Sequence, residues 1–405
     1  MIWSIAWRNV WRNRVRSLVV MGAIATGLFA GVFSTGFYKG MADMRLDSGI
    51  RSEVSHIQIH LPEYRLNNEI HLFIPHGDSL RGIIAQTEGV RGVSRRLIAD
   101  GFMKSAHGTR GIRLIGIEPE YEKQVTDISE HLLEGNYLSD EKRIPGILIG
   151  QKLADKLRLR LGSKVPVDLV DAEGNLSSKL FKVRGIFKTS NTGYDERNAF
   201  VRLEALQQQL AMPSGSAHEI AIYLENGMEV DNIAQSLQAQ FPGLEVSTWR
   251  DLSKELAMLV DAMDQYMYIF VIIILLALCF GIINTMLMVV MERVKELGML
   301  MAVGMERLRV FFMIVLESVF LSFTGGIAGI LVGYLVIRHY ETTPIRLRLL
   351  EGFEAYGYSS EIYTSIEPGT MFAIAGLVLV LGVVSSFYPA WKAIKLDPAD
   401  ALRTE

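Results

Sequence analysis

The chain has 405 residues, of which 50% are hydrophobic, and its formal net charge is -3. This balance, without a basic stripe interleaved with aromatic residues, argues against a nucleic-acid partner. The single cysteine, Cys279, excludes a disulfide bond within the chain.

Four apolar stretches are arranged as one near the amino terminus and three in the second half of the chain. Each has about the 20 apolar residues that a helix needs to cross a hydrocarbon core of about 30 Å. The predicted spans are 17–38, 266–291, 310–337 and 369–390. The first is longer than the apolar part of a signal peptide and lacks a clear cleavage site, which favours a retained anchor. The sequence therefore predicts an integral membrane protein.

Basic residues beside the spans predict the orientation, because Lys and Arg stay on the cytoplasmic side. Residues 1–16 form an amphipathic segment that contains Arg8, Arg12, Arg14 and Arg16. With this end in the cytoplasm, segments 39–265 and 338–368 lie outside, whereas the connection 292–309 and the tail 391–405 lie inside. The prediction depends mainly on the amino terminus, since the outer loop 338–368 also carries arginines.

The long segment 39–265 has the mixed pattern of an α/β domain. Ile57 and Ile59 alternate with Gln58 and His60, which is typical of a half-buried strand with its polar side chains at the surface. Other predicted elements are strands over 94–105, 112–117, 220–224 and 244–247, helices over 79–86, 148–157 and 230–240, and a hairpin of 165–170 and 180–187. The two ends, 39–110 and 216–265, are predicted to pair into one subdomain. Residues 111–215 then form an inserted, mostly β second subdomain.

No metal site or catalytic centre is predicted in this domain. His56 and His60 lie four residues apart on one strand face, about 13 Å, which is too far for one ion to bridge. The chain has no cysteine pair, no His-Glu-x-x-His motif and no Gly-x-Ser-x-Gly elbow.

The connection after the second span contains the most specific signal. Val294, Leu297 and Met301 fall on one face of a short helix that opens with charged residues. Periodicity alone leaves two interpretations open. The helix could grip a cytosolic partner, or it could only lie in the headgroup region.

A family resemblance favours the first interpretation. The run Glu292-Arg293-x-Lys295-Glu296-Leu297-Gly298-x-Leu300-x-Ala302-x-Gly304 resembles the coupling-helix motif of FtsX-like ABC transporter permeases. The tail, Tyr388-Pro389-Ala390-Trp391-Lys392-Ala393-x-x-Leu396-Asp397-Pro398-x-x-Ala401-Leu402-Arg403, is similar to their closing motif, and Ala6-Trp7-Arg8-Asn9-x-x-Arg12-Asn13 and the one-plus-three spans extend the likeness. Within this superfamily, the length and the strand around Ile57 look most like the lipoprotein-releasing LolC/LolE branch.

The resemblance implies a non-catalytic permease in the bacterial inner membrane, driven by a separate ABC ATPase dimer that binds the ATP and the magnesium. No cofactor is expected in this chain, which has no Gly-x-x-x-x-Gly-Lys-Ser/Thr phosphate loop. A second copy or a homologous permease would complete the dimer. The residues implied to dock the ATPase are Glu292, Arg293, Lys295, Glu296, Leu297, Gly298, Ala302 and Gly304.

Polar and small residues within the spans suggest contacts between helices. Glu317 is the only formal charge inside a span, and its cost unless paired or hydrated makes it a candidate for packing or coupling, with proton transport as the alternative. Gly325, Gly329 and Gly333 recur every four residues and allow close helix contact, within one subunit or between two. Asn284 is predicted to hydrogen-bond across such a contact.

The substrate is less well defined by the sequence. In the lipoprotein-releasing relatives, lipid anchors enter between the first two spans, where flexible methionines suit variable acyl chains. Packing of the two helices explains the same residues equally well. The candidate contacts are Phe37, Met41, Met44, Met258, Leu259, Met263 and Met267. Three functions stay open: lipoprotein extraction with handover to a periplasmic carrier, MacB-like efflux through a periplasmic adaptor, and FtsX-like signalling to a cell-wall hydrolase.

Overall fold

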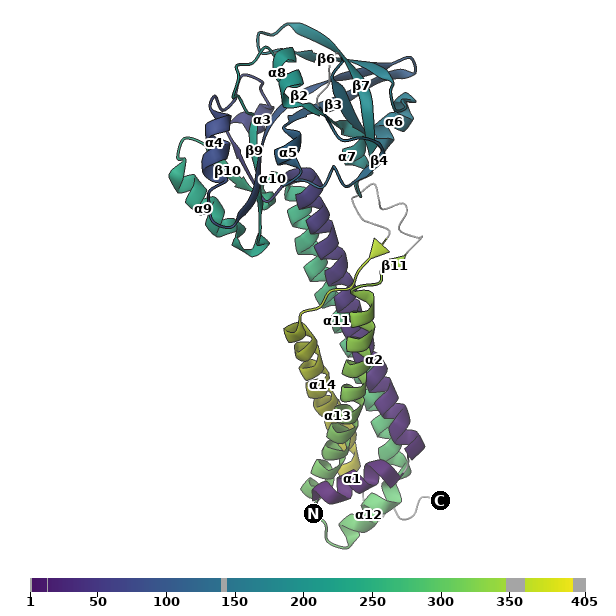
Figure 1. The fold of residues 1–405 in the computed structure, drawn as a ribbon. Coiled ribbons are helices and arrows are strands. Elements are labelled where there is room, and N and C mark those ends of the chain that lie inside the picture. Colours follow the sequence, from purple (N-terminus) through teal and green to yellow (C-terminus); the bar gives the residue numbers. More distant parts are fainter. Residues whose placement is uncertain (1, 13, 140–143, 347–360, 396–405) are drawn as a thin grey trace. The chain divides into compact units, whose positions relative to one another are not determined.

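The computed structural model describes residues 2–12, 14–139, 144–346 and 361–395, and the chain divides into two compact units (Figure 1). The first unit contains Met1–Asp43, Asp261–Arg346 and Glu361–Glu405. The described part of the second unit is Met44–Val260. These divisions separate the apolar helices from the α/β domain.

The first unit is helical and contains all four predicted spans. Each span lies inside a longer helix, and the four helices are long and apolar enough to cross a membrane. The helices of this unit are α1 (Ile2–Arg12), α2 (Arg14–Ser48), α11 (Lys254–Glu292), α12 (Val294–Ala302), α13 (Arg307–Tyr340) and α14 (Pro368–Ile394). α2 and α11 extend beyond the predicted spans, and the division between the two units falls within each of these helices. The prediction of four transmembrane helices is confirmed.

Two predicted segments of this unit differ from the structure in extent. The outer loop 338–368 begins within α13 and includes the short antiparallel pair β11 (Ile345–Arg346) and β12 (Glu361–Ile362), and its residues 347–360 lie outside the described part. The tail 391–405 begins within α14. Residues 396–405, with the end of the closing motif, lie outside the described part.

The glycine stripe of α13 packs against α2 of the same chain. A Cβ built on Gly325 would lie 2.7 Å from the carbonyl oxygen of Met21, and one on Gly329 would lie 2.7 Å from that of Ala25. Real Cβ atoms do not approach backbone oxygen so closely, so both glycines are needed for this contact. The stripe therefore serves packing within one subunit, the first of the two predicted alternatives.

We expect Gly329→Ala to loosen this helix pair, because neither backbone can give way cheaply. Overpacking of this kind typically costs about 1–3 kcal/mol of unfolding free energy. The matched control is Gly376→Ala on α14, where an added Cβ meets no atom within 4 Å. Thermal unfolding of the purified protein should show a lower midpoint for Gly329→Ala alone. Equal midpoints for the two variants would contradict the packing role.

The second unit is built on one ten-stranded sheet, with the strand order β10-β1-β9-β2-β3-β8-β5-β7-β4 and β6 paired with β2 and β7. Its strands are β1 (Ile57–His60), β2 (Val90–Ser105), β3 (Gly108–Ile117), β4 (Leu132–Gly135), β5 (Gly146–Gly150), β6 (Lys164–Val170), β7 (Leu176–Phe187), β8 (Asn198–Arg202), β9 (Glu219–Leu224) and β10 (Glu245–Thr248). Its helices are α3 (Tyr64–Asn67), α4 (Gly77–Ile84), α5 (Pro119–Glu122), α6 (Gln151–Leu157), α7 (Thr192–Arg197), α8 (Leu203–Gln209), α9 (Val230–Gln240) and α10 (Trp249–Leu252), with a π-helix at Gly49–Val54 and a 3₁₀ turn at Gly227–Glu229.

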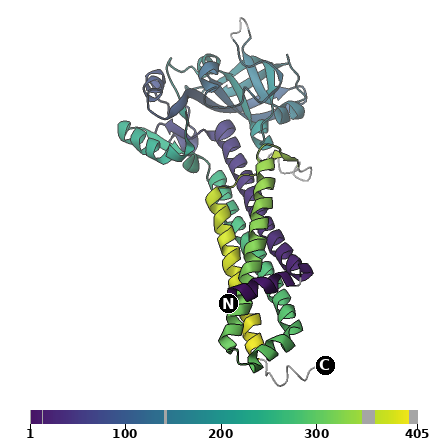
Figure 2. The same cartoon turned by 60° about the horizontal axis from the view of Figure 1, so that its bottom comes forward.

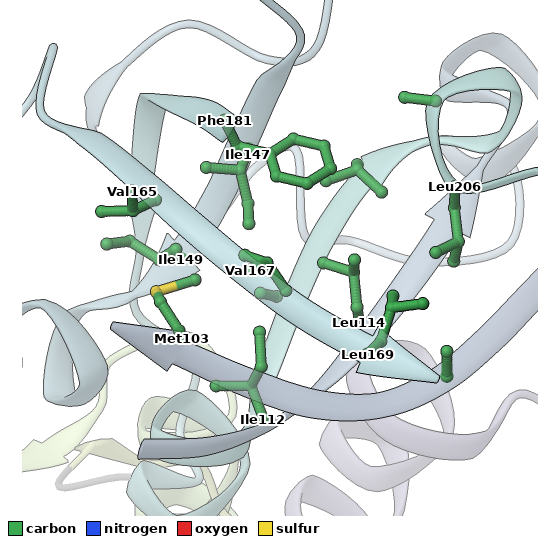
Figure 3. Close-up of a cluster of buried hydrophobic side chains, with 14 of the residues drawn as sticks. Met103, Ile112, Leu114, Ile147, Ile149, Val165, Val167, Leu169, Phe181 and Leu206 are labelled. Carbon is green, nitrogen blue, oxygen red and sulfur yellow. The ribbon is translucent and has the colours of Figure 1, made fainter. Parts of the chain in front are cut away.

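β2 is the strand that joins the two halves of this domain. Its beginning pairs with β9, and its end pairs with β3 and β6. One hydrophobic core lies on the side of β1, β9, α4 and α9, and a second fills the space among β3, β5–β8, α6 and α8 (Figure 3). A third, smaller core includes Ile117, Ile128 and Phe187. The predicted subdomain boundary at residue 111 falls inside β3.

Two predictions of local structure were wrong in detail. The helix predicted over 148–157 begins as β5, since Ile147 to Ile149 are fully buried between β7 and β8, and only 151–157 is helical. β1 was predicted to be half-buried, yet all four of its residues are buried. His60 lies in the interior because a buried cluster of charged side chains covers its face. The hairpin of β6 and β7 is confirmed.

Candidate functional site

The connection after α11 folds as the short helix α12, as its periodicity predicts. Leu297 and Gly298 are buried against the helices of the first unit, whereas Lys295, Met299 and Val303 are exposed. Gly304 follows the helix with φ +103°, a left-handed conformation that glycine adopts without strain. α12 therefore presents one free face, with a mixed apolar and cationic character.

Glu317, the charge inside α13, is paired rather than isolated. It is 5% exposed, and its two carboxylate oxygens accept hydrogen bonds from Arg293 Nη1 at 3.0 and 3.1 Å. The Asn9 side-chain amide of α1 donates to Glu317 Oε1 at 2.6 Å. Arg293 is the residue between α11 and α12. The Glu317 carboxylate of α13 therefore forms hydrogen bonds both with α1 and with the residue that precedes α12.

Glu296 of α12 extends the same cluster. It accepts hydrogen bonds from Arg12 of α1 and, at 3.1 Å, from Arg293 Nε. The hydrogen bond from Arg12 is the main cause that lowers the pKa of Glu296. Burial alone would lower the pKa of Arg293, but the Glu317 carboxylate raises it above its ordinary value. Both shifts favour the ionised forms of Glu296 and Arg293 near neutral pH.

We call Asn9, Arg12, Arg293, Glu296 and Glu317 the polar cluster. These five residues line a cavity of about 310 Å³ that is also bordered by α2 and α11. α1 lies across the helices at the end where α12 is found (Figures 1 and 2). The hydrogen bonds of the polar cluster therefore connect the start of α12 with both α13 and α1.

The predicted docking residues do not all lie on one surface. Lys295 and Ala302 are exposed on α12, and Gly304 is exposed just after it. Met299 of α12 and Val303, which follows the helix, are also exposed, although the motif did not single them out. The others make contacts within the chain. Leu297 and Gly298 are buried in packing, and Arg293 and Glu296 belong to the polar cluster. Glu292 also interacts with another residue of the chain.

The remaining candidates are dispersed over the helices. Asn284 is exposed on α11, away from the glycine stripe, so it takes no part in that contact. Of the candidate substrate contacts, Met258 is 70% exposed and Met263 is buried. The others, Phe37, Met41, Met44, Leu259 and Met267, are intermediate. Beside Phe37, Tyr38 of α2 contacts Phe270 of α11, with ring centroids 5.0 Å apart.

Sequence reasoning missed the partners of Glu317. Asn9 was noted only as part of a motif, and Arg293 only as a docking residue. A buried carboxylate requires a cation or several donors. The arginine directly after the preceding span was therefore the signal that could have identified the pair.

Two family models match this chain. One, described as MacB-like periplasmic core domain, covers residues 17–240, and the other, FtsX-like permease C-terminal, covers 268–398. The chain is 24% identical over 346 residues to the "Lipoprotein-releasing system transmembrane protein LolC" of Neisseria meningitidis serogroup B, which covers 80% of this chain and 81% of that protein.

A second relative is matched over a shorter stretch. The chain is 33% identical over 155 residues to the "Macrolide export ATP-binding/permease protein MacB" of Syntrophobacter fumaroxidans, covering 38% of this chain and 19% of that protein. Among solved structures, the periplasmic region of MacB from Actinobacillus actinomycetemcomitans matches 52% of this chain and 92% of its own at 11% identity, with a TM-score of 0.35.

The MacB-like model spans more than half of the chain, and the FtsX-like model spans the last three transmembrane helices with α12. The predicted family is therefore confirmed, and this chain belongs to the FtsX-like, MacB-type family of ABC transporter permeases.

Proposed function

We propose that this permease extracts lipid-anchored proteins from the inner membrane, using ATP hydrolysis in a separate ABC ATPase. The observation that supports this function is the match to LolC, which covers most of both chains. In this proposal the permease is not itself an enzyme, and the ATPase dimer binds the ATP and Mg²⁺. Both termini and α12 lie in the cytoplasm, and the α/β domain lies in the periplasm.

The polar cluster supplies the coupling in this proposal. The ATPase grips the exposed face of α12, and closure of its dimer displaces that helix. Arg293 transmits the displacement to Glu317 of α13, and Glu296 transmits it to Arg12 of α1. Glu317 also accepts a hydrogen bond from Asn9, which is a second connection to α1. The glycine contact then carries it from α13 to α2, because closely packed backbones move together.

The substrate would enter beside α2 and α11. Met258 is exposed, and methionine adapts to acyl chains of different lengths. A periplasmic carrier then receives the released lipoprotein, and a second permease, identical or homologous, completes the complex.

The test is affinity purification of the full-length protein from its native membrane in mild detergent, with a photoreactive amino acid at Phe37. We expect mass spectrometry to find an ABC ATPase that co-purifies with the permease. We also expect it to find lipoproteins that are crosslinked at position 37. The matched control is a photoreactive group at Phe372, which is 65% exposed on α14. Absence of an ATPase would overturn the coupled permease, and crosslinks of equal strength at Phe372 would overturn the substrate position.

Efflux is the second candidate, because the MacB relative is more similar over its shorter stretch. Recovery of a periplasmic adaptor without lipoproteins would favour efflux over extraction. Recovery of a cell-wall hydrolase would instead favour signalling. The same purification therefore separates the three functions.

A further inference from the structure

The interior of the α/β domain holds a polar cavity that transport does not explain. It has a volume of about 400 Å³ and is lined by residues of β1, β2, β3, α3 and α7. Four arginines line it, Arg65, Arg96, Arg113 and Arg197, against two glutamates. The cavity belongs wholly to the second unit.

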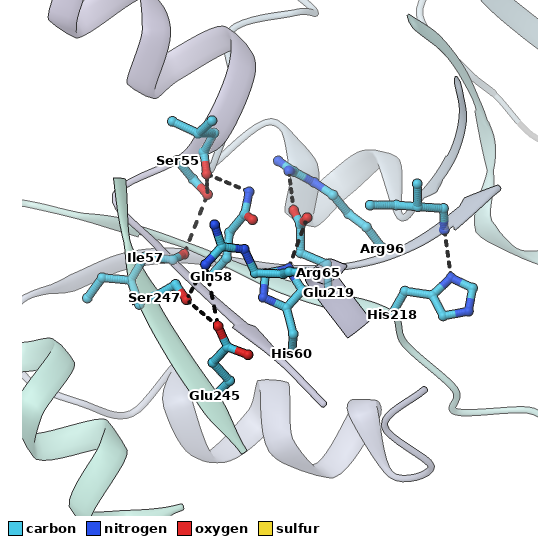
Figure 4. Close-up of polar contacts among 12 residues, drawn as sticks. Ser55, Ile57, Gln58, His60, Arg65, Arg96, His218, Glu219, Glu245 and Ser247 are labelled. Atoms are coloured by element: carbon cyan, nitrogen blue, oxygen red, sulfur yellow. Dashed lines mark hydrogen bonds and ion pairs between the residues drawn. The ribbon is translucent and has the colours of Figure 1, made fainter. Parts of the chain in front are cut away.

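A network of buried charges forms its floor (Figure 4). Arg96 donates to Glu219 Oε1 at 2.6 Å and binds both oxygens of Glu122, at 2.7 and 3.1 Å. His60 Nε2 lies 3.5 Å from Glu219 Oε2. Arg96, Glu122 and Glu219 satisfy one another, so this part of the lining is fixed in place without a ligand.

Two buried polar atoms in the lining of this cavity have no hydrogen-bond partner among the described residues. They are Nδ1 of His60 and the hydroxyl of Tyr64, and both residues are only 2% exposed. The Tyr64 ring lies between the rings of His60 and His218, with centroids 5.6 and 5.2 Å away. A buried hydroxyl without a partner is costly, so its retention beside a cavity points to a group that enters from outside.

The neighbouring His218 shows what a satisfied buried histidine looks like here. Its Nδ1 accepts from the Ile98 amide at 2.9 Å, and its Nε2 lies 2.9 Å from the Ile70 carbonyl, to which it donates. Burial lowers the pKa of His218, which agrees with this neutral form. Both ring nitrogens of His218 form hydrogen bonds, whereas His60 and Tyr64 each have one polar atom without a hydrogen-bond partner in the described structure.

The arginines that line the cavity indicate which charge a ligand would carry. Arg65 is held by Glu245 and Ser247, and Arg113 by Asp100. Arg197 of α7 is exposed at the cavity, and the described structure gives it neither an ion pair nor a hydrogen bond. A free guanidinium and a buried phenol are both donors, and oxyanions accept from both.

We propose that this cavity binds a small anionic molecule through a carboxylate or phosphate group. Arg197 holds the charge, and the Tyr64 hydroxyl donates a hydrogen bond from the wall. Burial raises the pKa of Tyr64, so the hydroxyl keeps its proton at neutral pH. Such a site would let a periplasmic solute act on the domain independently of the transported substrate.

The experiment is calorimetric titration of the full-length protein in detergent with succinate and, separately, with inorganic phosphate, at constant ionic strength. We expect saturable binding of at least one of them below about 1 mM. Binding of succinate alone would identify a carboxylate ligand, and binding of phosphate alone a phosphate ligand. If neither binds, the proposal fails.

Three variants locate the site. Arg197→Gln should weaken binding at least about tenfold, because a charge-assisted bond is lost. Tyr64→Phe should weaken it about fivefold without loss of fold, since its hydroxyl has no protein partner. Arg110→Gln changes an exposed arginine outside the cavity and should leave binding unchanged. Wild-type affinity in both Arg197→Gln and Tyr64→Phe would overturn the assignment, with circular dichroism confirming that each variant is folded.

Discussion

Met299→Asp is expected to abolish ATPase stimulation by this permease while leaving the protein folded in the membrane. Met299 is 54% exposed on the free face of α12, beside Lys295 and Val303. An aspartate buried in a docking groove would lose its hydration without gaining a partner, and central interface residues of this kind commonly contribute about 2 kcal/mol or more. ATP turnover of the assembled complex should therefore fall at least about tenfold.

The control for this prediction is Met228→Asp in the α/β domain. Met228 is 89% exposed, so the same change of chemistry is made on the surface of the α/β domain, which our proposal places in the periplasm, away from the ATPase. Stimulated turnover should stay at the wild-type level in this control. Unchanged turnover in Met299→Asp would mean that α12 is not the docking element. Glu296→Lys and Gly298→Trp test docking less cleanly, because one disturbs the polar cluster and the other a buried contact.

Arg293→Gln is expected to be the most destabilising change in the polar cluster. It leaves the Glu317 carboxylate, which is 5% exposed, with only the Asn9 amide as a partner. Removal of one partner from a buried ion pair typically costs about 3–5 kcal/mol. Glu317→Gln should cost less, because Arg293 keeps its bond to Glu296. Unfolding of the purified variants in increasing denaturant measures both effects.

The double variant Arg293→Gln with Glu317→Gln provides the critical comparison. Because it contains no uncompensated charge, it should be more stable than Arg293→Gln alone. A double variant that loses the sum of both single losses would show that the two side chains act independently. Glu317→Gln should also reduce transport more than complex assembly, if the pair couples the helices. Equal losses would assign it to packing only.

Elements with a regular pattern of apolar residues were predicted correctly from the sequence. The four spans follow from runs of apolar residues, and the hairpin of β6 and β7 follows from two strands around the turn at Gly174. The helix predicted at Leu148 was wrong because a fully buried strand and a buried helix show the same continuous apolar run. Only the neighbouring strands β7 and β8 decide between them.

The functional groups were harder to place because their partners are distant in the chain. Asn9 and Glu317 are 308 positions apart, and no local pattern relates them. The same holds for His60, whose alternation suggested a surface strand. Its burial depends on Glu219 and Arg96, which reach it from other strands of the sheet. Periodicity shows which face is polar, but not whether a charged partner covers that face.

The long strand β2 also limits how members of this family can exchange parts. A chimera that took residues 111–215 from a relative would be cut inside β3, and the grafted half would still need its hydrogen-bond ladder to the recipient's β2. A shift of one residue in that ladder would turn every side chain of the graft to the opposite face. Engineering of the inserted half therefore has to carry β2 with it, or preserve the pairing of Ile98 with Ile115.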